Sequence, residues 1–441
     1  MEIVIYPDGP WSSYPFARLA MLLASVGTVH YVTERSDERL PAPILPVSRQ
    51  EIREAGTPLL TIVSHPYWTY EASSLARGPL VALLPDFPND RGALIRRCVK
   101  ELSAAADLLC TASESFFLEQ AFRRDAVLLL SGADPDAAGT VQVQGIDLEV
   151  RDYEALFLRA VRSLIDTSPP SAGWATHLQL HLRIPFYEEL RRTLGPHETV
   201  SFLLGSYEYL TGRLDDAEAH VAEAFHQACL NRSPGSLASH FRFLSAIAAR
   251  KGDLEGALTI YGISAVTDSE RADYSVLLQW ANQGRFALAL SGLYRLNDDS
   301  RNALAQLRTP ESDIEEVRRI EFQLLTESAR WDEACSLLSP SMRQTSEQRR
   351  IADLANGFRC RLRGQRHEAI SWFLRAAETD SNALAHILEI KAIDDELSGL
   401  TGSPALGLTE ESEDDAPLEP RLPAGSQADG QQADRDAPGS E

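Results

Sequence analysis

Residues 2–32 read EIVIYPDGPWSSYPFARLAMLLASVGTVHYV, and this stretch decides the fold of the first third of the chain. Two short runs of mostly β-branched or aromatic residues, 2–6 and 28–32, enclose a segment whose apolar residues predict a helix over 13–26. Nearly continuous apolar strands separated by helices are typical of a parallel sheet covered on both faces. The chain therefore begins as an α/β fold.

The same alternation continues to about residue 165. Ser113 and Glu114 stand where a helix is expected to begin, because a serine oxygen can cap free N–H groups and a carboxylate favours the helix dipole. Five or six strands with crossover helices predict one Rossmann-like parallel sheet in residues 1–165. Further strands are predicted at 58–64, 80–84, 107–111 and 126–130, and further helices at 93–106 and 113–123.

A different pattern, a small residue followed after four residues by Ala, occurs five times beyond residue 173. Successive alanines are 32 to 45 residues apart, which brackets the 34-residue period of helix–turn–helix repeats. Such repeats need a sharp turn at the small residue and a close helix approach at the alanine. The five pairs are Gly212 with Ala217, Gly252 with Ala257, Gly284 with Ala289, Ala329 with Ala334, and Gly364 with Ala369.

Additional small and aromatic residues fit the same pattern. Gly205 and Ala224 flank the first turn at close-packing positions, whereas Tyr261 and Phe373 are expected to fill grooves in later repeats. The set resembles the tetratricopeptide (TPR) family over roughly 200 residues, although the family's Trp, Tyr and terminal Pro positions match poorly. The resemblance implies a helical solenoid over residues 174–400, joined through a linker at 166–173, that binds a protein partner.

Charge and composition exclude several classes of protein. The chain has 441 residues and a net charge of −22, so it is poorly suited to displace counterions from nucleic-acid phosphates. Residues 401–441 are rich in Gly, Pro, Ser and acids, and nearly lack large apolar side chains. Such a segment cannot offset its ordering entropy and is predicted to be a disordered acidic tail.

The cellular environment is inferred from what the sequence lacks. Its beginning, MEIVIYPDGP, has neither the basic segment nor the long apolar segment of a secretory signal, and no apolar run approaches the ~18 residues that span a bilayer. The five cysteines are far apart and include no CxxC pair, which indicates reduced core thiols. A cytoplasmic protein without a membrane span is expected.

Several quoted stretches of the first domain occur in the order found in GT-B glycosyltransferases of bacterial surface-polysaccharide synthesis. They are the loop with Trp11 and the run PFARLAMLLASVG after the first strand, SHPYW at 64–68, LLPDFPND at 83–90, RRCVKELSAAADLLCTASESF at 96–116 and AVLLLSGAD at 126–134. These residues resemble the acceptor-side domain of that family. The resemblance implies a sugar-related function for residues 1–165.

The family's second domain, which supplies most of the nucleotide-sugar site, has no counterpart here. Only about fifteen residues separate Asp134 from an amphipathic segment at 151–165, which resembles the helix that returns from the second domain to the first in GT-B enzymes. The donor half of the site is therefore expected to be missing. A helical array follows in its place.

Candidate site residues follow from the rule that ligands bind outside the carboxyl ends of the strands in an open α/β sheet. His65 and Asp86 are the candidate catalytic residues, because an inverting sugar transfer needs a general base near the acceptor hydroxyl. Both also have a simpler explanation, since a histidine can cap a loop and an aspartate can hold a turn. The candidate ligand-binding residues are Asp8, Gly9, Trp11, Trp68, Asp90, Ser113, Glu114, Ser131, Gly132 and Asp134.

No resident cofactor and no metal site are expected. Asp134-Pro135-Asp136 matches a two-carboxylate metal motif, but turn residues alone explain it. The chain has no Walker A sequence, no GxGxxG after the first strand and no HExxH. A nucleotide sugar would enter as substrate rather than as cofactor.

Three functions remain open at this point. The first is a glycosyltransferase-like scaffold of surface-glycan synthesis, non-catalytic or dependent on a partner, in which a GT-B half-domain is joined to a protein-binding array. The second is an active nucleotide-sugar transferase whose donor site is completed by a partner. The third is a TPR adaptor in which the α/β domain only caps the array.

Overall fold

The computed structural model describes residues 2–35, 38–55, 60–76, 78–84, 92–130, 141–143, 146–148, 150–166, 172–308 and 315–401. These described residues all belong to one compact unit. The predicted tail at 401–441 lies outside the described residues except for Thr401, as does most of the predicted linker at 166–173.

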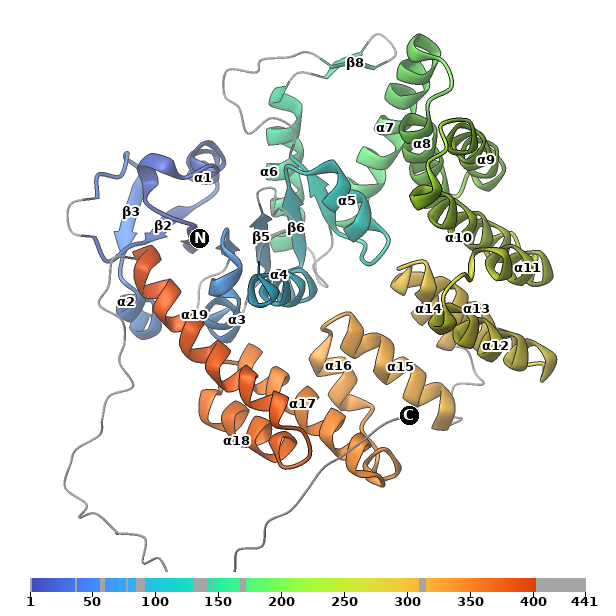
Figure 1. Ribbon diagram of the computed structural model, residues 1–441. Helices are drawn as coiled ribbons and strands as arrows, with labels where there is room; N and C mark the ends of the chain where they lie inside the picture. The colour runs from blue at the N-terminus through green and yellow to red at the C-terminus, as the bar shows by residue number, and fades with distance from the viewer. Residues whose placement is uncertain are drawn as a thin grey trace, which may run out of the picture. The chain divides into compact units, whose positions relative to one another are not determined.

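The first part of the chain forms a single seven-stranded parallel sheet (Figure 1). The strand order is β3-β2-β1-β4-β5-β6-β7, with every neighbouring pair parallel. The strands are β1 (Glu2–Tyr6), β2 (Thr28–Val32), β3 (Ile44–Val47), β4 (Leu60–Val63), β5 (Leu80–Leu84), β6 (Leu108–Thr111) and β7 (Val127–Leu129).

Six of these strands were predicted, with bounds that agree to within two residues. β3 was not, because its sequence ILPV is short and contains Pro46. Proline is tolerated on an edge strand, where one side of the backbone needs no partner. β3 holds that edge position and pairs only with β2 among the described strands. The predicted total of five or six strands was therefore too low.

Alternate residues of the strands enter two separate apolar cores. Ile3 and Ile5 of β1 point to one face of the sheet, and Val4 and Tyr6 point to the other. The first face is covered by α1 (Ala17–Leu23) and by α6 (Val150–Asp166), which contacts α1. The helix predicted at 151–165 therefore packs against the sheet.

The second face is covered by helices that follow the strands on the other side. These include α2 (Arg49–Ala55), α3 (Thr69–Leu75), α4 (Ala93–Ala105) and α5 (Glu114–Ala121). Ser113 caps α5 as predicted, its Oγ accepting a hydrogen bond from the N–H of Phe116 at 3.4 Å. Between β7 and α6, a short antiparallel pair, β8 (Val141–Val143) and β9 (Ile146–Leu148), was not predicted.

The rest of the described chain is a series of helical hairpins. Each of the five predicted turns lies between two contacting helices, and its small residue has a positive φ, from +55° at Ala329 to +87° at Gly252. The five alanines that follow the turns have no exposed surface. The hairpins are α8 (Glu198–Thr211) with α9 (Leu214–Leu230), α10 (Pro234–Arg250) with α11 (Leu254–Ser264), α12 (Asp268–Asn282) with α13 (Phe286–Leu296), α15 (Glu315–Glu327) with α16 (Trp331–Ser336), and α17 (Ser346–Leu362) with α18 (Arg366–Ala377).

Close helix approach occurs where glycine was expected to allow it. A Cβ added to Gly205 of α8 would lie 2.6 Å from Cγ2 of Val221 on α9. In the last hairpin, Gly357 leaves room for the ring of Phe373, which is fully buried. Ala224 and Tyr261 are buried as well.

The array begins against the edge strand β7, where α7 (Gly173–Leu194) contacts the sheet. The Thr176 hydroxyl accepts a hydrogen bond from the N–H of Val127 and donates one to its carbonyl, both at 2.7 Å. The Gln179 amide does the same with the N–H and the carbonyl of Leu129, at 2.8 and 2.9 Å. Residues three apart on a helix are ~4.5 Å apart along its axis and alternate strand residues are ~6.6 Å apart, a difference that the longer glutamine side chain spans. Two side chains thus satisfy the open edge of the sheet.

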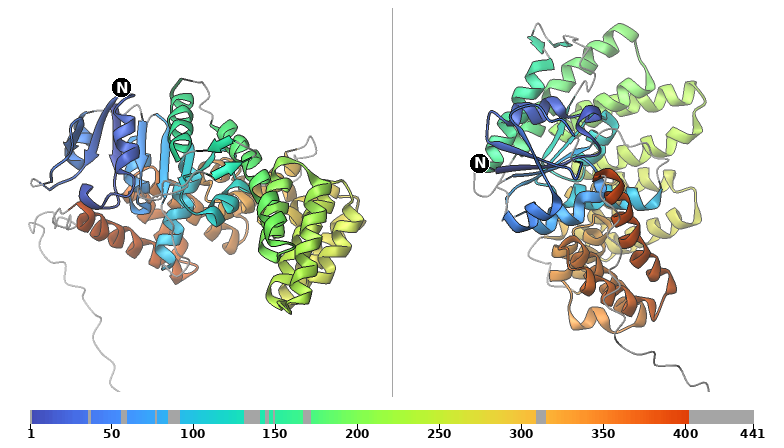
Figure 2. Two further views of the ribbon diagram at one scale, coloured as in Figure 1. Left: turned by 90° about the horizontal axis from the view of Figure 1, so that it is seen from above. Right: turned by 90° about the vertical axis from the view of Figure 1, so that its left-hand side faces the viewer.

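The array also ends on the α/β domain. Helix α17 contacts α3, and α19 (Ala385–Thr401) contacts the short helix η2 (Pro66–Trp68) that follows β4. Ile393 and Leu397 of α19 enter the same apolar core as Leu180 and Leu204 from the start of the array. Figures 1 and 2 show the hairpins leading from α7 around to α19.

No helix among the described residues is both long enough and apolar enough to span a bilayer.

Gly364 provides a test of the contact between the last hairpin of the array and α3. It has a φ of +69°, and an added Cβ would lie 2.6 Å from Cβ of Ser74 on α3, whereas Gly252 has a φ of +87° with nothing within 4 Å. Gly252→Ala should lose about 1–2 kcal/mol of unfolding free energy from backbone strain alone. Gly364→Ala should lose about 1–3 kcal/mol more from overpacking. Urea unfolding measures both, and equal losses would mean that this turn does not pack on α3.

Candidate functional site

The carboxyl ends of β1 and β4 mark the point where the strand order reverses. From β1 the chain proceeds to β2 and β3 on one side, and from β4 to β7 on the other. This topological switch point is the usual ligand site in doubly wound sheets. The predicted residues Asp8, Gly9 and Trp11 follow β1 here, and His65 follows β4.

The loop after β1 is fixed by three hydrogen bonds from different elements. The indole N–H of Trp68 donates to the carbonyl of Pro7 at 2.7 Å, and the Tyr31 hydroxyl donates to the carbonyl of Gly9 at 2.6 Å. The hydroxyls of Tyr14 and Ser64 lie 2.6 Å apart. A loop held in this way keeps one geometry before a ligand arrives, which reduces the entropy cost of binding.

Asp8 stands in this loop as a half-buried carboxylate. Among the described residues it has no ion-pair partner, and Tyr14 and Tyr31 are its neighbours. Burial raises the pKa of Asp8, and a hydrogen bond to its own backbone only partly opposes this shift. A carboxylate kept without a cation is ready to accept hydrogen bonds from a ligand.

Trp11 follows three residues after Asp8 and is partly exposed. Its ring stands nearly perpendicular to that of Tyr31, with centroids 5.2 Å apart, and its backbone N–H donates to the carboxylate of Glu38. Tyr14 and Tyr31, which the sequence analysis did not select, complete the aromatic surroundings. The sequence signal that could have identified them is their position, since Tyr31 lies in β2 and Tyr14 lies in the segment between β1 and α1.

Two other predicted residues near the switch point have structural roles. His65 caps η2, its Nδ1 accepting from the N–H of Tyr67 at 3.3 Å, which is the simpler of the two explanations weighed for it. Trp68 has no exposed surface, and its indole N–H donates a hydrogen bond to the carbonyl of Pro7. It was expected to contact a ligand, but a fully buried ring acts instead by fixing the loop.

Ser113 and Glu114 are used by the fold rather than left open. Ser113 caps α5, and the Glu114 carboxylate accepts from the hydroxyl of Tyr207 on α8 at 2.5 Å, with Arg183 of α7 at 3.9 Å. The array thus covers the carboxyl end of β6. Asp86, Asp90, Ser131, Gly132 and Asp134 lie outside the described residues.

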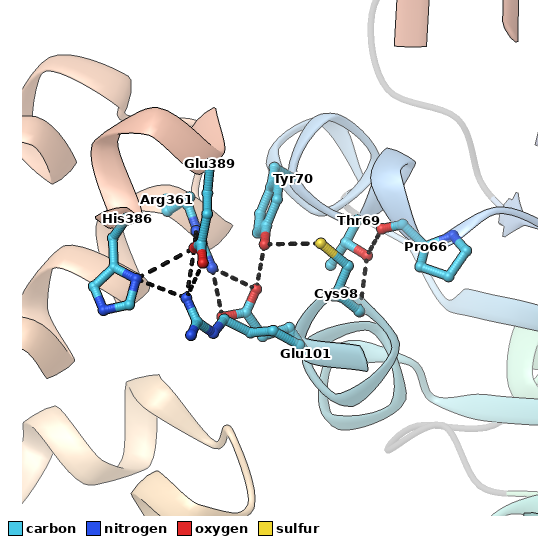
Figure 3. A network of polar contacts seen from close by, with 9 residues as sticks. Pro66, Thr69, Tyr70, Cys98, Glu101, Arg361, His386 and Glu389 are labelled. Atoms are coloured by element: carbon cyan, nitrogen blue, oxygen red, sulfur yellow. Dashed lines mark hydrogen bonds and ion pairs between the residues drawn. The ribbon is translucent and has the colours of Figure 1, made fainter. Parts of the chain in front are cut away.

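At the other end of the array, a buried ion pair joins α4 to α17 (Figure 3). Arg361 Nη2 lies 2.9 and 3.1 Å from the two carboxylate oxygens of Glu101, and both side chains are at most 3% exposed. The Tyr70 hydroxyl of α3 donates to Glu101 at 2.5 Å, and its ring lies under the Arg361 guanidinium. Glu101 and Arg361 are 260 positions apart in the sequence, so their ion pair fixes the array on the domain.

A second layer of charge surrounds this pair. Arg97 of α4 donates to both oxygens of Glu389 on α19 at 2.5–2.6 Å, and Arg361 Nη1 reaches Glu389 at 3.1 Å. Burial alone would raise the pKa of Glu389, but contact with His386 and the charges of Arg97 and Arg361 lower it to about 2.

A cavity of about 1010 Å³ lies between the outer surfaces of α4 and α5 and the helices α13, α14 (Ser300–Leu307), α15 and α16. The sequence did not predict it. Here it is called the basic cavity. Its described lining has eight Lys or Arg side chains against six Asp or Glu, in a chain whose net charge is −22. The domain contributes Arg96, Lys100, Arg123 and Arg124, and the array contributes Arg295, Arg301, Arg308 and Arg330.

No protein-family model matches the chain, and no curated protein matches it significantly. Within the described residues, no group of three or more His, Cys, Asp or Glu side chains is placed to hold a metal ion. All five cysteines are free thiols, and four of them are buried.

Asp8→Asn should stabilise the fold at neutral pH. Because the folded pKa of Asp8 is raised, ionisation costs folding free energy, and that cost is absent below the unfolded pKa near 3.8 and grows as pH rises through it. The variant should therefore unfold at a higher urea concentration than the wild type at pH 7 and at the same concentration below pH 3.8. A lower midpoint at pH 7 would contradict a strained carboxylate.

Glu101→Leu should leave Arg361 buried without its main partner and cost about 3–5 kcal/mol of unfolding free energy. The double variant Glu101→Leu/Arg361→Met removes both charges and should recover much of that loss. Urea unfolding of the two single variants and the double variant gives the coupling energy. Simple additivity of the two losses would show that the side chains do not interact.

Glu389 should make the same interface sensitive to acid. Its lowered pKa contributes stability that is present above the unfolded pKa near 4.5 and is lost as pH falls toward about 2. Hydrogen exchange of α19 should therefore accelerate below pH 4.5, and Glu389→Gln should flatten this dependence. An unchanged pH profile in the variant would exclude Glu389 as its origin.

Proposed function

We propose that this chain is a glycosyltransferase-like scaffold of surface-glycan synthesis. Its α/β domain binds a sugar-bearing ligand at the β1/β4 switch point, and its helical array binds a protein partner. The chain does not transfer sugar on its own. The observation that carries the proposal is the fixed loop that holds Asp8, which has no ion-pair partner among the described residues, and the partly exposed Trp11.

The chemistry of this loop suits a sugar. Carboxylates accept hydrogen bonds from hydroxyl groups, and aromatic rings pack against the apolar faces of sugar rings. The ordered motifs that resemble the GT-B acceptor-side domain lie in this same part of the chain. The packing of α6 against α1 and the sheet also agrees with the return helix of that family.

The lack of independent catalysis follows from the missing second domain. In GT-B enzymes the nucleotide-sugar site lies between two α/β domains, whereas the described part of this chain has one parallel sheet and one two-stranded pair. The TPR-like hairpins occupy the position in the sequence that follows, and their protein-binding role rests on that resemblance. A partner transferase would then supply the donor site.

Thermal unfolding in the presence of UDP-, GDP- and dTDP-sugars and the free nucleotides, with and without Mg²⁺, tests the site. A ligand at 100 times its Kd should add about 2.7 kcal/mol of stability. Trp11→Ala and Asp8→Asn should abolish the shift. The control Phe286→Ala, which removes an exposed aromatic ring from α13, should retain it.

Two outcomes would contradict the proposal. Turnover of a nucleotide sugar by the chain alone would make it an enzyme. The absence of any shift across the panel would favour a second function, an adaptor whose α/β domain caps the array. The specific support for that alternative is that α7, α8 and α19 all bury apolar side chains in one core with the sheet, as a cap must.

A further inference from the structure

The basic cavity lies apart from the switch point. Its lining includes residues of α4 and α5 and extends to Asp107 and Asp125. Asp107 immediately precedes β6 and Asp125 stands two residues before β7, so the cavity lies at the amino ends of these strands, opposite to the switch point. Its far wall comes from α13 to α16, so it forms only because the array docks on the domain. Its volume of about 1010 Å³ is at the upper end of the range for small-molecule sites.

Most acids of the cavity are already neutralised by its arginines. Asp298 and Glu119 pair with Arg123, and Asp125 pairs with Arg301. Glu327 pairs with Arg295, and Glu333 with Arg308 and Arg330. The sixth acid, Asp107, accepts a hydrogen bond from the N–H of Leu80 at 2.8 Å.

Arg96 has an interaction partner of its own, which leaves two cations of the lining without a paired acid among the described residues. Lys100 has no ion-pair or hydrogen-bond partner within the part of the chain that the structure describes, and it lies one turn after Arg96 on α4. The guanidinium of Arg124 donates only to the neutral backbone carbonyls of Ser103 and Ala106, and its buried Nε has no partner there. Buried donors are rarely left without an acceptor.

The electrostatics favour a bound anion. Loss of water lowers the pKa of Lys100 and the charge of Arg123 lowers it further, whereas the smaller effects of Glu327, Glu101 and Asp298 only partly oppose this shift. Burial lowers the pKa of Arg124 to about 10. Both cations would therefore gain from a bound negative charge.

We propose that the basic cavity binds a small phosphate-bearing polyanion, of the diphosphate or nucleoside diphosphate class, with Lys100 and Arg124 as its principal contacts. Two adjacent phosphates match two unpaired cations better than one carboxylate does, because phosphate oxygens accept several charge-assisted hydrogen bonds. Arg96, on the same face of α4 as Lys100, extends the positive lining toward the rest of such a ligand. This site does not depend on the proposed sugar site.

Isothermal titration of the full chain with inorganic pyrophosphate, at constant ionic strength, tests the proposal. Binding with one site per chain is expected, and Lys100→Gln should weaken it about ten- to a hundredfold, since a hydrogen bond to a charged group contributes about 1.5–3 kcal/mol. Lys251→Gln is the matched control, because Lys251 is an exposed lysine of the array that pairs with Asp215 and Glu218 and does not line the cavity. It should leave the affinity unchanged.

Three results would overturn the proposal: no heat at millimolar pyrophosphate, equal weakening by both lysine variants, or undiminished binding in Lys100→Gln. A nucleoside diphosphate distinguishes this site from the sugar site. Binding that is lost in Lys100→Gln but kept in Trp11→Ala belongs to the basic cavity. Binding with the opposite dependence belongs to the switch point and counts against the cavity.

Discussion

The two anchors of the helical array on one α/β domain are the constraint on which the rest of the structure depends. At its start, Thr176 and Gln179 complete the hydrogen bonds of the edge strand β7, and at its end Arg361 is buried against Glu101. Each anchor alone would be a local contact. Together they fix a stretch of nearly 200 residues at both ends, so the hairpins between must follow one path.

Closure of the array shapes one of the two candidate sites directly. The switch-point loop belongs to the α/β domain alone, but the carboxyl end of β6 is covered by Tyr207 and Arg183 of the array. The basic cavity has one wall from each part, and ion pairs such as that between Asp125 and Arg301 cross it. Loss of the second anchor would therefore open the cavity.

Much of the fold could be predicted from the sequence because its signals are local. Apolar runs identified six strands, and the turn pattern located all five hairpins to the residue, including Ala329, which adopts the positive φ usual for glycine. β3 was missed because four residues with a proline carry little pattern. The docking of α17 on α4 could not be predicted, since the pairing of Glu101 with Arg361 has no signature in either segment.

The residues of the candidate site could be selected from the sequence in part for the same reason. Strand ends indicated Asp8 and Trp11, but nothing in the local sequence showed that Trp68 would donate to Pro7 or that Glu114 would accept from Tyr207 of the array. The cavity could not be predicted, because its charged residues come from six helices or the loops that adjoin them. The one sequence feature that could have drawn attention to it is Lys100, one of only three lysines in a chain whose basic residues are otherwise arginines.

Closure of the array also has a consequence for how such a protein can evolve. An open solenoid gains or loses a repeat at little cost, because each repeat contacts only its neighbours. Here, duplicating or deleting one hairpin would displace α17 and α19 from Tyr70 and Glu101, since the starting point on β7 cannot move. The number of hairpins is thus set by geometry, and change is confined to substitutions and to the lengths of loops.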